Sequence, residues 1–115
     1  MNDYIKIKVK SLINIAVEVW RLDKLNIESD SDRIAIKRFI NYLQRFLEEY
    51  KVEIIDLTEQ PYEPGMAVEI VFTEGKDVLV PYKEIITEMV RPVVLIDGKV
   101  VKHGQVVTKK VKTGG

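Results

Sequence analysis

The sequence predicts an α+β protein in which an N-terminal helical hairpin precedes a small, mostly antiparallel β-domain. Apolar residues recur at helical spacing as far as residue 50, and after residue 51 they form short runs separated by turn residues. A polar stretch at residues 29–32 divides the helical part in two. We therefore expect a helical hairpin at residues 1–51, a β-domain at 52–109 and a flexible tail at 110–115.

The first helix is expected from one continuous apolar face. Its members are spaced three or four residues apart: Ile5, Val9, Leu12, Ala16 and Val19. Residues 4–10 also alternate between apolar and basic, which is a pattern typical of a strand. We favour a helix from residue 4 because the apolar face continues to Trp20 without a turn residue.

The second helix is expected to begin at the polar stretch, where Ser29, Asp30 and Asp32 offer capping side chains and negative charge. Its wide apolar face consists of Ile36, Phe39, Ile40, Leu43, Phe46, Leu47 and Tyr50. A lone hairpin cannot cover two apolar faces, so we expect a homodimer that forms a four-helix bundle. The residues expected at this dimer interface are Leu12, Ala16, Trp20, Phe39, Leu43 and Phe46.

Seven strands are expected in the second half, at residues 52–57, 67–72, 77–80, 85–90, 93–96, 99–101 and 105–108. Asp97-Gly98 predicts a type I′ hairpin turn, because both central residues of that turn need positive φ. Pro81 and Pro92 are expected at strand ends, since proline lacks the backbone N–H that a sheet interior requires.

The junction between the two halves resembles that of a known family. Leu43 and Leu47 end the helical face, a strand runs from Val52 to Ile55, and residues 61–64 read Pro-Tyr-Glu-Pro. This order is similar to the junction in GrpE, the nucleotide exchange factor of DnaK-type chaperones. That family has a Leu-x-x-x-Leu helix end, a Val-x-x-Ile strand and a Pro-Phe-Asp-Pro loop.

A second match lies between Thr87 and Val107, where the apolar positions and the turn coincide with those of the GrpE family. The family's Gly-Tyr is replaced by Val93-Val94, its Arg-Pro-Ala by Lys102-His103-Gly104, and its His-Glu-Ala by Gly65-Met66-Ala67-Val68. No heptad repeat is sustained, so we expect no coiled-coil stalk. The resemblance covers roughly residues 32–109.

The resemblance implies a non-enzymatic protein-binding module, a co-chaperone that acts on a DnaK-like ATPase through its β-domain. The expected partner surface has an apolar centre and a charged rim, formed by Tyr62, Met66, Met89, Val94, Ile96, Lys99 and Lys102. The alternative is a structural or adaptor subunit of a larger assembly, with the same fold and no exchange activity. The loop at residues 61–64 is either a contact loop or a structural corner.

Composition argues against catalysis and metal binding. The chain has no cysteine, which excludes disulfides, zinc–thiolate sites and thiol catalysis. His103 is the only histidine, and we expect it to be an exposed loop residue. Asp30, Asp32 and Asp56 lack the spacing of a calcium loop. No P-loop, nucleophile elbow or dinucleotide fingerprint occurs, so we expect no catalytic residue, no cofactor and no metal.

Charge and hydropathy bear on partners and location. Lys plus Arg and Asp plus Glu both number 18, which argues against a dedicated nucleic-acid binder. The lysines after Asp97 either contact phosphate, as in a nucleic acid, or an acidic partner surface, or, as we favour, they protect an edge strand and a solvated tail. No apolar run approaches the roughly 20 residues needed to span a membrane, and the first residues show no secretory signal. We therefore expect a cytoplasmic protein.

Overall fold

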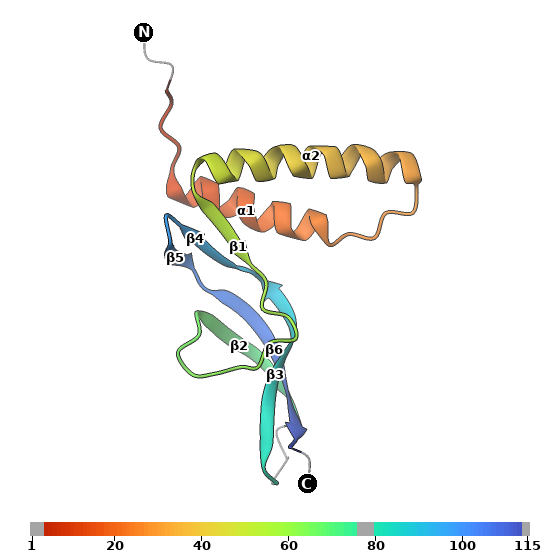
Figure 1. Ribbon diagram of the computed structural model, residues 1–115, viewed down its shortest axis with the longest axis vertical. Helices are drawn as coiled ribbons and strands as arrows, with labels where there is room; N and C mark the ends of the chain where they lie inside the picture. Colours follow the sequence, from red (N-terminus) through yellow and green to blue (C-terminus); the bar gives the residue numbers. More distant parts are fainter. Residues whose placement is uncertain (1–3, 76–79, 114–115) are drawn as a thin grey trace. The chain divides into compact units, whose positions relative to one another are not determined.

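The computed structural model describes residues 4–75 and 80–113, and within them two helices precede six strands (Figure 1). This order confirms the α+β class. The chain divides into two compact units. The helical unit is Met1–Ile54 with Val94–Val101, and the β unit is Ile55–Val93 with Lys102–Gly115.

Helix α1 (Val9–Asp23) begins later than its apolar spacing predicts. Residues 4–8 have no regular structure, so the prediction of a helix from residue 4 was wrong there. Tyr4 and Ile5 are 90% and 85% exposed. A helical turn that buries nothing does not offset the entropy lost in ordering it, so the helix starts within one turn of the first buried residue, Leu12.

Helix α2 (Asp30–Glu49) begins at the predicted polar stretch. Ser29 is its N-cap, and the Ser29 hydroxyl accepts a hydrogen bond from the backbone N–H of Asp32 over 3.4 Å. Asp30 and Asp32 place negative charge in the first turn, where the helix dipole favours it. Asp30 also forms an ion pair with Arg33. The predicted capping is therefore confirmed.

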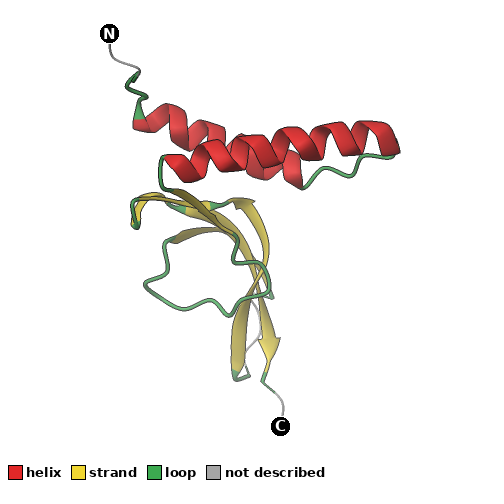
Figure 2. Cartoon of the chain, turned by 45° about the horizontal axis from the view of Figure 1, so that its top comes forward, coloured by secondary structure: helices red, strands yellow, loops and turns green. Residues whose placement is uncertain are grey.

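The two helices lie side by side and share the apolar core of the helical unit (Figure 2). Its buried members are Leu12, Ala16, Val17, Val19, Ile40, Leu47, Val52 and Val94. The last two belong to β1 (Val52–Ile55) and β4 (Val93–Ile96), which form a sheet with β5 (Lys99–Lys102) in the order β1-β4-β5. Because these strands help to build the helical core, the units do not coincide with the segments expected at 1–51 and 52–109.

The turn between β4 and β5 confirms the prediction at Asp97-Gly98. Asp97 has a φ of 54° and Gly98 a φ of 77°, the positive values that a type I′ turn requires at both positions. The Asp97 N–H donates to the carbonyl oxygen of Lys51 over 2.9 Å, and Lys51 itself has a φ of 58°. This hydrogen bond thus joins the tight connection between α2 and β1 to the hairpin turn between β4 and β5.

The sheet of the β unit has the order β2-β6-β3. Its strands are β2 (Val68–Glu74), β3 (Tyr82–Arg91) and β6 (Gly104–Lys112). The central strand β6 runs antiparallel to β3 and parallel to β2, so this sheet is mixed. Pro81 precedes β3 and Pro92 follows it, as expected for residues without a backbone N–H.

Strand β6 continues through Lys112, beyond its predicted end at Thr108 and into the segment expected to be a flexible tail. Lys110 lies opposite Glu84, and its ammonium group is 4.5 Å from the centroid of the Tyr82 ring. Each lysine of this strand therefore lies opposite a residue of β3, and a pattern read along one segment does not reveal this pairing. Of the strand expected at 77–80, residues 77–79 lie outside the described residues.

A polar chain connects the three strands of the β unit. Thr108 on β6 is fully buried, and its hydroxyl donates to Glu84 Oε2 on β3 over 2.7 Å. The hydroxyls of Thr108 and Thr73, which lies on β2, are 3.0 Å apart. Because the Thr108 proton is used for Glu84, Thr73 is the donor of this second bond. Burial of the Thr108 hydroxyl is favourable only with such partners.

We expect Thr108→Val to lower the free energy of unfolding by about 1–2 kcal/mol, because it removes two partly buried hydrogen bonds at nearly constant volume. Urea denaturation followed by circular dichroism measures this loss. Thr87→Val is the matched control, since Thr87 is exposed and its hydroxyl makes one bond of 3.3 Å. The control should change stability by less than about 0.5 kcal/mol. Equal effects of the two substitutions would contradict a structural role for the hydrogen bonds of Thr108.

Candidate functional site

The two most exposed large apolar side chains in the described part of the β unit lie at a bulge in β2. The register against β6 shifts between Ile70 and Phe72, so Val71 is an extra residue without a partner. This shift brings both Val71 and Phe72 to the surface, where they are 47% and 56% exposed, and the next residue, Thr73, is half-buried again. Such bulges redirect side chains at sheet edges.

The outer edge of β2 is open. β2 is the outermost strand in the order β2-β6-β3, and no described strand pairs with its other side. Glu69 and Glu74 are exposed on either side of the apolar pair. We name Glu69, Val71, Phe72 and Glu74 the β2 patch. An apolar centre with a charged rim is typical of protein interfaces, and an open strand edge accepts a strand from another chain.

The residues expected to form one partner surface are divided between the two units. Val94, Ile96 and Lys99 belong to the helical unit, and Tyr62, Met66, Met89 and Lys102 belong to the β unit. Lys99 is exposed, and Tyr62, Met66, Ile96 and Lys102 are half-buried. Met89 and Val94 are only 6% and 0% exposed. These two side chains belong to the interior and present no surface to a partner.

Met89 is buried because it fills space beside a glycine of the neighbouring strand. A Cβ added to Gly104 would lie 2.9 Å from the Met89 Cε and 3.0 Å from the carbonyl oxygen of Arg91. The Met89 sulfur also accepts the backbone N–H of Leu57 over 2.9 Å. The apolar pattern of β3 alone does not distinguish such a residue from one at the surface.

The proline loop (residues 61–64) is fastened to β3. Just before it, Glu59 and Gln60 exchange backbone hydrogen bonds with Ile86, over 2.7 Å and 2.9 Å. Within it, the Tyr62 N–H donates to the Glu84 carbonyl oxygen over 2.8 Å. These bonds favour the structural corner over the contact loop, since the backbone of the loop extends the sheet.

An apolar groove runs between α1 and α2. Its volume is about 390 Å³, and it is lined by Asn14, Ile15, Glu18, Val19, Leu22, Phe39 and Leu43. Phe39 is 55% exposed, although it is large and apolar. Leu43 is half-buried. The hairpin therefore leaves part of its apolar surface uncovered, and two of the residues expected at the dimer interface lie there.

The other residues expected at the dimer interface are placed differently. Leu12 and Ala16 are 5% and 0% exposed, so they pack within the chain's own core. Trp20 and Phe46 are half-buried. The Lys24 ammonium group lies 4.8 Å from the centroid of the Trp20 ring, a cation–π contact at the end of α1. The sequence pattern identifies the apolar face but does not separate its buried centre from its exposed margin.

The polar candidates His103 and Asp56 are both exposed in the described part of the chain. Asp56 accepts hydrogen bonds from the backbone N–H and the hydroxyl of Thr58, which is a local turn. Among residues 4–75 and 80–113, no three His, Cys, Asp or Glu side chains gather as a metal ion would require. No helix described here has the length and apolar character to cross a membrane.

Comparison with models of known protein families gives no match, and neither does comparison with curated proteins. The resemblance to GrpE therefore rests on the residues of the junction and of the run from Thr87 to Val107. It stays a prediction.

We expect Met89→Ala to lower the free energy of unfolding by about 2–4 kcal/mol, because it opens a cavity in the β unit. Met66→Ala is the matched control, since Met66 is half-buried, and its substitution should cost less than about 1 kcal/mol. Denaturation in urea measures both values. A Met89→Ala variant as stable as the wild type would contradict the burial of Met89 and support its expected place on the partner surface.

Proposed function

We propose that this chain is a non-enzymatic, GrpE-like protein-binding module that docks on a DnaK-like ATPase through the β2 patch. The observation that carries the proposal is the joint exposure of Val71 and Phe72 on an open sheet edge. Burial of this pair by a partner would contribute roughly 2 kcal/mol, since each side chain is about half exposed. The order of elements from Leu43 to Pro64 supports the GrpE-like interpretation.

The chemistry of the β2 patch indicates how a partner would be selected. The open edge of β2 offers backbone N–H and C=O groups to which an extended segment of a partner can hydrogen-bond. Glu69 and Glu74 favour a basic surface around the apolar contact and oppose an acidic one. A structural or adaptor subunit would use the same patch without changing the nucleotide affinity of its partner.

We also propose that two copies associate through the apolar groove to form the four-helix bundle. Phe39 and Leu43 lie at this groove together with Ile15, Val19 and Leu22 of α1. A second copy is a suitable occupant because it offers the same apolar surface in a two-fold arrangement. Leu12 and Ala16 support this interface from the core without contacting the second copy.

Exchange activity is tested by the release of fluorescent ADP from a DnaK-type ATPase in a stopped-flow experiment. We expect the protein to accelerate release by at least about tenfold at saturation. Val71→Ser with Phe72→Ser should abolish this effect, because the apolar centre of the β2 patch is lost. Val90→Ser is the control, since Val90 is 41% exposed on β3 and lies outside the patch.

If the protein bound the ATPase without accelerating ADP release, the adaptor function would be favoured over nucleotide exchange. If the double variant were as active as the wild type, the β2 patch would not be the docking surface.

The dimer is tested by sedimentation velocity at micromolar concentration. We expect a dimer for the wild type and a folded monomer for Phe39→Asp, because the charge would otherwise be buried without a partner in the interface. Ile34→Asp is the matched control on the same helix, since Ile34 is 60% exposed and does not line the groove. A monomeric wild type would contradict the proposal.

A further inference from the structure

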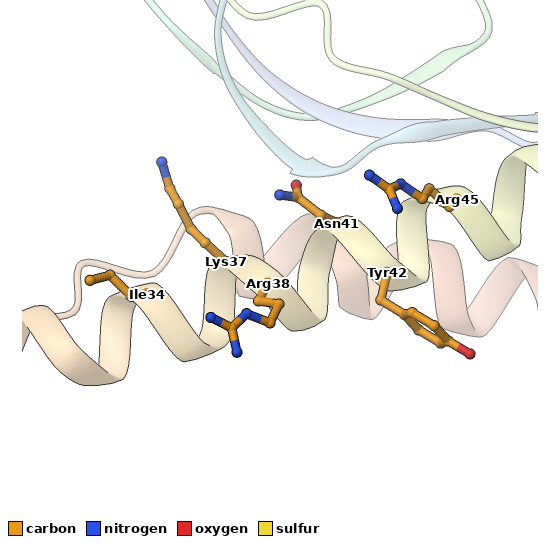
Figure 3. A pocket seen from close by; sticks show the side chains of 6 residues that line it. All are labelled: Ile34, Lys37, Arg38, Asn41, Tyr42 and Arg45. Carbon is orange, nitrogen blue, oxygen red and sulfur yellow. The ribbon is translucent and has the colours of Figure 1, made fainter.

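A cationic face lies on α2. It consists of Ile34, Lys37, Arg38, Asn41, Tyr42 and Arg45, which surround a shallow hollow of about 460 Å³. Figure 3 shows Arg38 and Tyr42 extending to one side of the helix, and Lys37, Asn41 and Arg45 extending to the other. None of these residues lines the apolar groove. Helix α2 therefore presents two surfaces of different chemistry.

The charges of the cationic face are not neutralised within the described chain. Between Arg33 and Leu47, α2 contains four basic residues and no acidic one. Arg33 pairs with Asp30, but none of the ion pairs found among residues 4–75 and 80–113 includes Lys37, Arg38 or Arg45. Because acidic and basic residues are equal in number in the whole chain, this excess of positive charge is local.

Two exposed apolar side chains lie among these cations. Tyr42 is 71% exposed and Ile34 is 60% exposed. A face that only meets water usually carries polar residues throughout. Tyrosine and arginine are instead the residue types enriched where protein interfaces gain most of their binding energy. The composition therefore favours a binding surface over a solvated one.

The distribution of charge along α2 selects the class of partner. Acidic residues bound the cationic face at both ends, with Asp32 before it and Glu48 after it. These two residues are about 24 Å apart along a helix. A nucleic-acid backbone is negative over its whole length and would be repelled beyond this stretch. A helix that lies on a membrane needs a wide apolar face, whereas the exposed apolar side chains among these cations are Ile34 and Tyr42.

We propose that the cationic face binds a short acidic, amphipathic helix of a partner protein. Its carboxylates would contact Lys37, Arg38 and Arg45, and its apolar residues would cover Ile34 and Tyr42. Lys37 and Arg45 are about 12 Å apart along the helix axis, so carboxylates two turns apart on the partner match them. This surface is separate from the β2 patch, and its use does not depend on nucleotide exchange.

The test uses a synthetic amphipathic helix of about 18 residues, or about 27 Å, with glutamates at one-turn intervals beside two leucines. Fluorescence anisotropy gives its Kd, and NMR locates the contact by amide shifts. We expect shifts concentrated between Lys37 and Arg45. The variant K37E/R38E/R45E should bind at least about tenfold more weakly. A second variant, K37Q/R38Q/R45Q, should show an intermediate loss and covers the case in which charge reversal disturbs folding.

The matched control is K6E/K8E/K10E, which changes the net charge equally at three exposed residues of the same unit. It should keep the affinity within about twofold. A peptide with lysine in place of each glutamate should bind K37E/R38E/R45E more tightly than it binds the wild type, since the contact depends on complementary charge.

Three results would overturn the proposal. The first is an equal loss of affinity in the control and in the charge-reversed variant. The second is binding of duplex DNA or anionic vesicles at this face without binding of the acidic peptide. The third is a change of sedimentation in K37E/R38E/R45E, which would make the face a contact between copies of this chain.

Discussion

The β unit depends on its central strand, β6. Alternate residues of β6 are buried, and both edges of β6 are hydrogen-bonded to neighbouring strands. Gly104, Val106 and Thr108 are all buried, and β2 and β3 flank them. The neighbouring strands do not keep a constant register against this row, because β2 shifts between Ile70 and Phe72 and β3 shifts twice between Ile86 and Arg91. Bulges allow both neighbours to bend around a regular centre. The exposed β2 patch is therefore a result of how the sheet fits its central strand.

Features that depend on neighbouring residues could be predicted from the sequence. The Ser29 cap, the Asp97-Gly98 turn and the placement of proline at strand ends each follow from the conformational preferences of one or two residues. The change from helix to strand after residue 50 follows from a change in apolar period. For these elements, interactions between residues close together in the sequence decide the structure.

Features that depend on residues far apart in the chain could not be predicted in this way. Met89 and Val94 look like surface candidates along their own strands, and their burial depends on Gly104 and on the helical core. The β2 patch was missed because it requires a register shift against β6, although the adjacent Val71 and Phe72 interrupt an alternating strand. The apolar face of the hairpin was predicted, and only packing shows that Leu12 is inside and Phe39 is outside.

The central position of β6 also affects the order of events during biosynthesis. β2 and β3 precede β6 in the chain, so both are synthesised before the strand to which they bond. Until residues 104–112 have been added, β2 has two open edges and an exposed Phe72. Pairings between distant segments form slowly and leave strands open to wrong partners in the meantime. In a nascent chain, β2 and β3 therefore lack their shared pairing partner until the last strand has been synthesised.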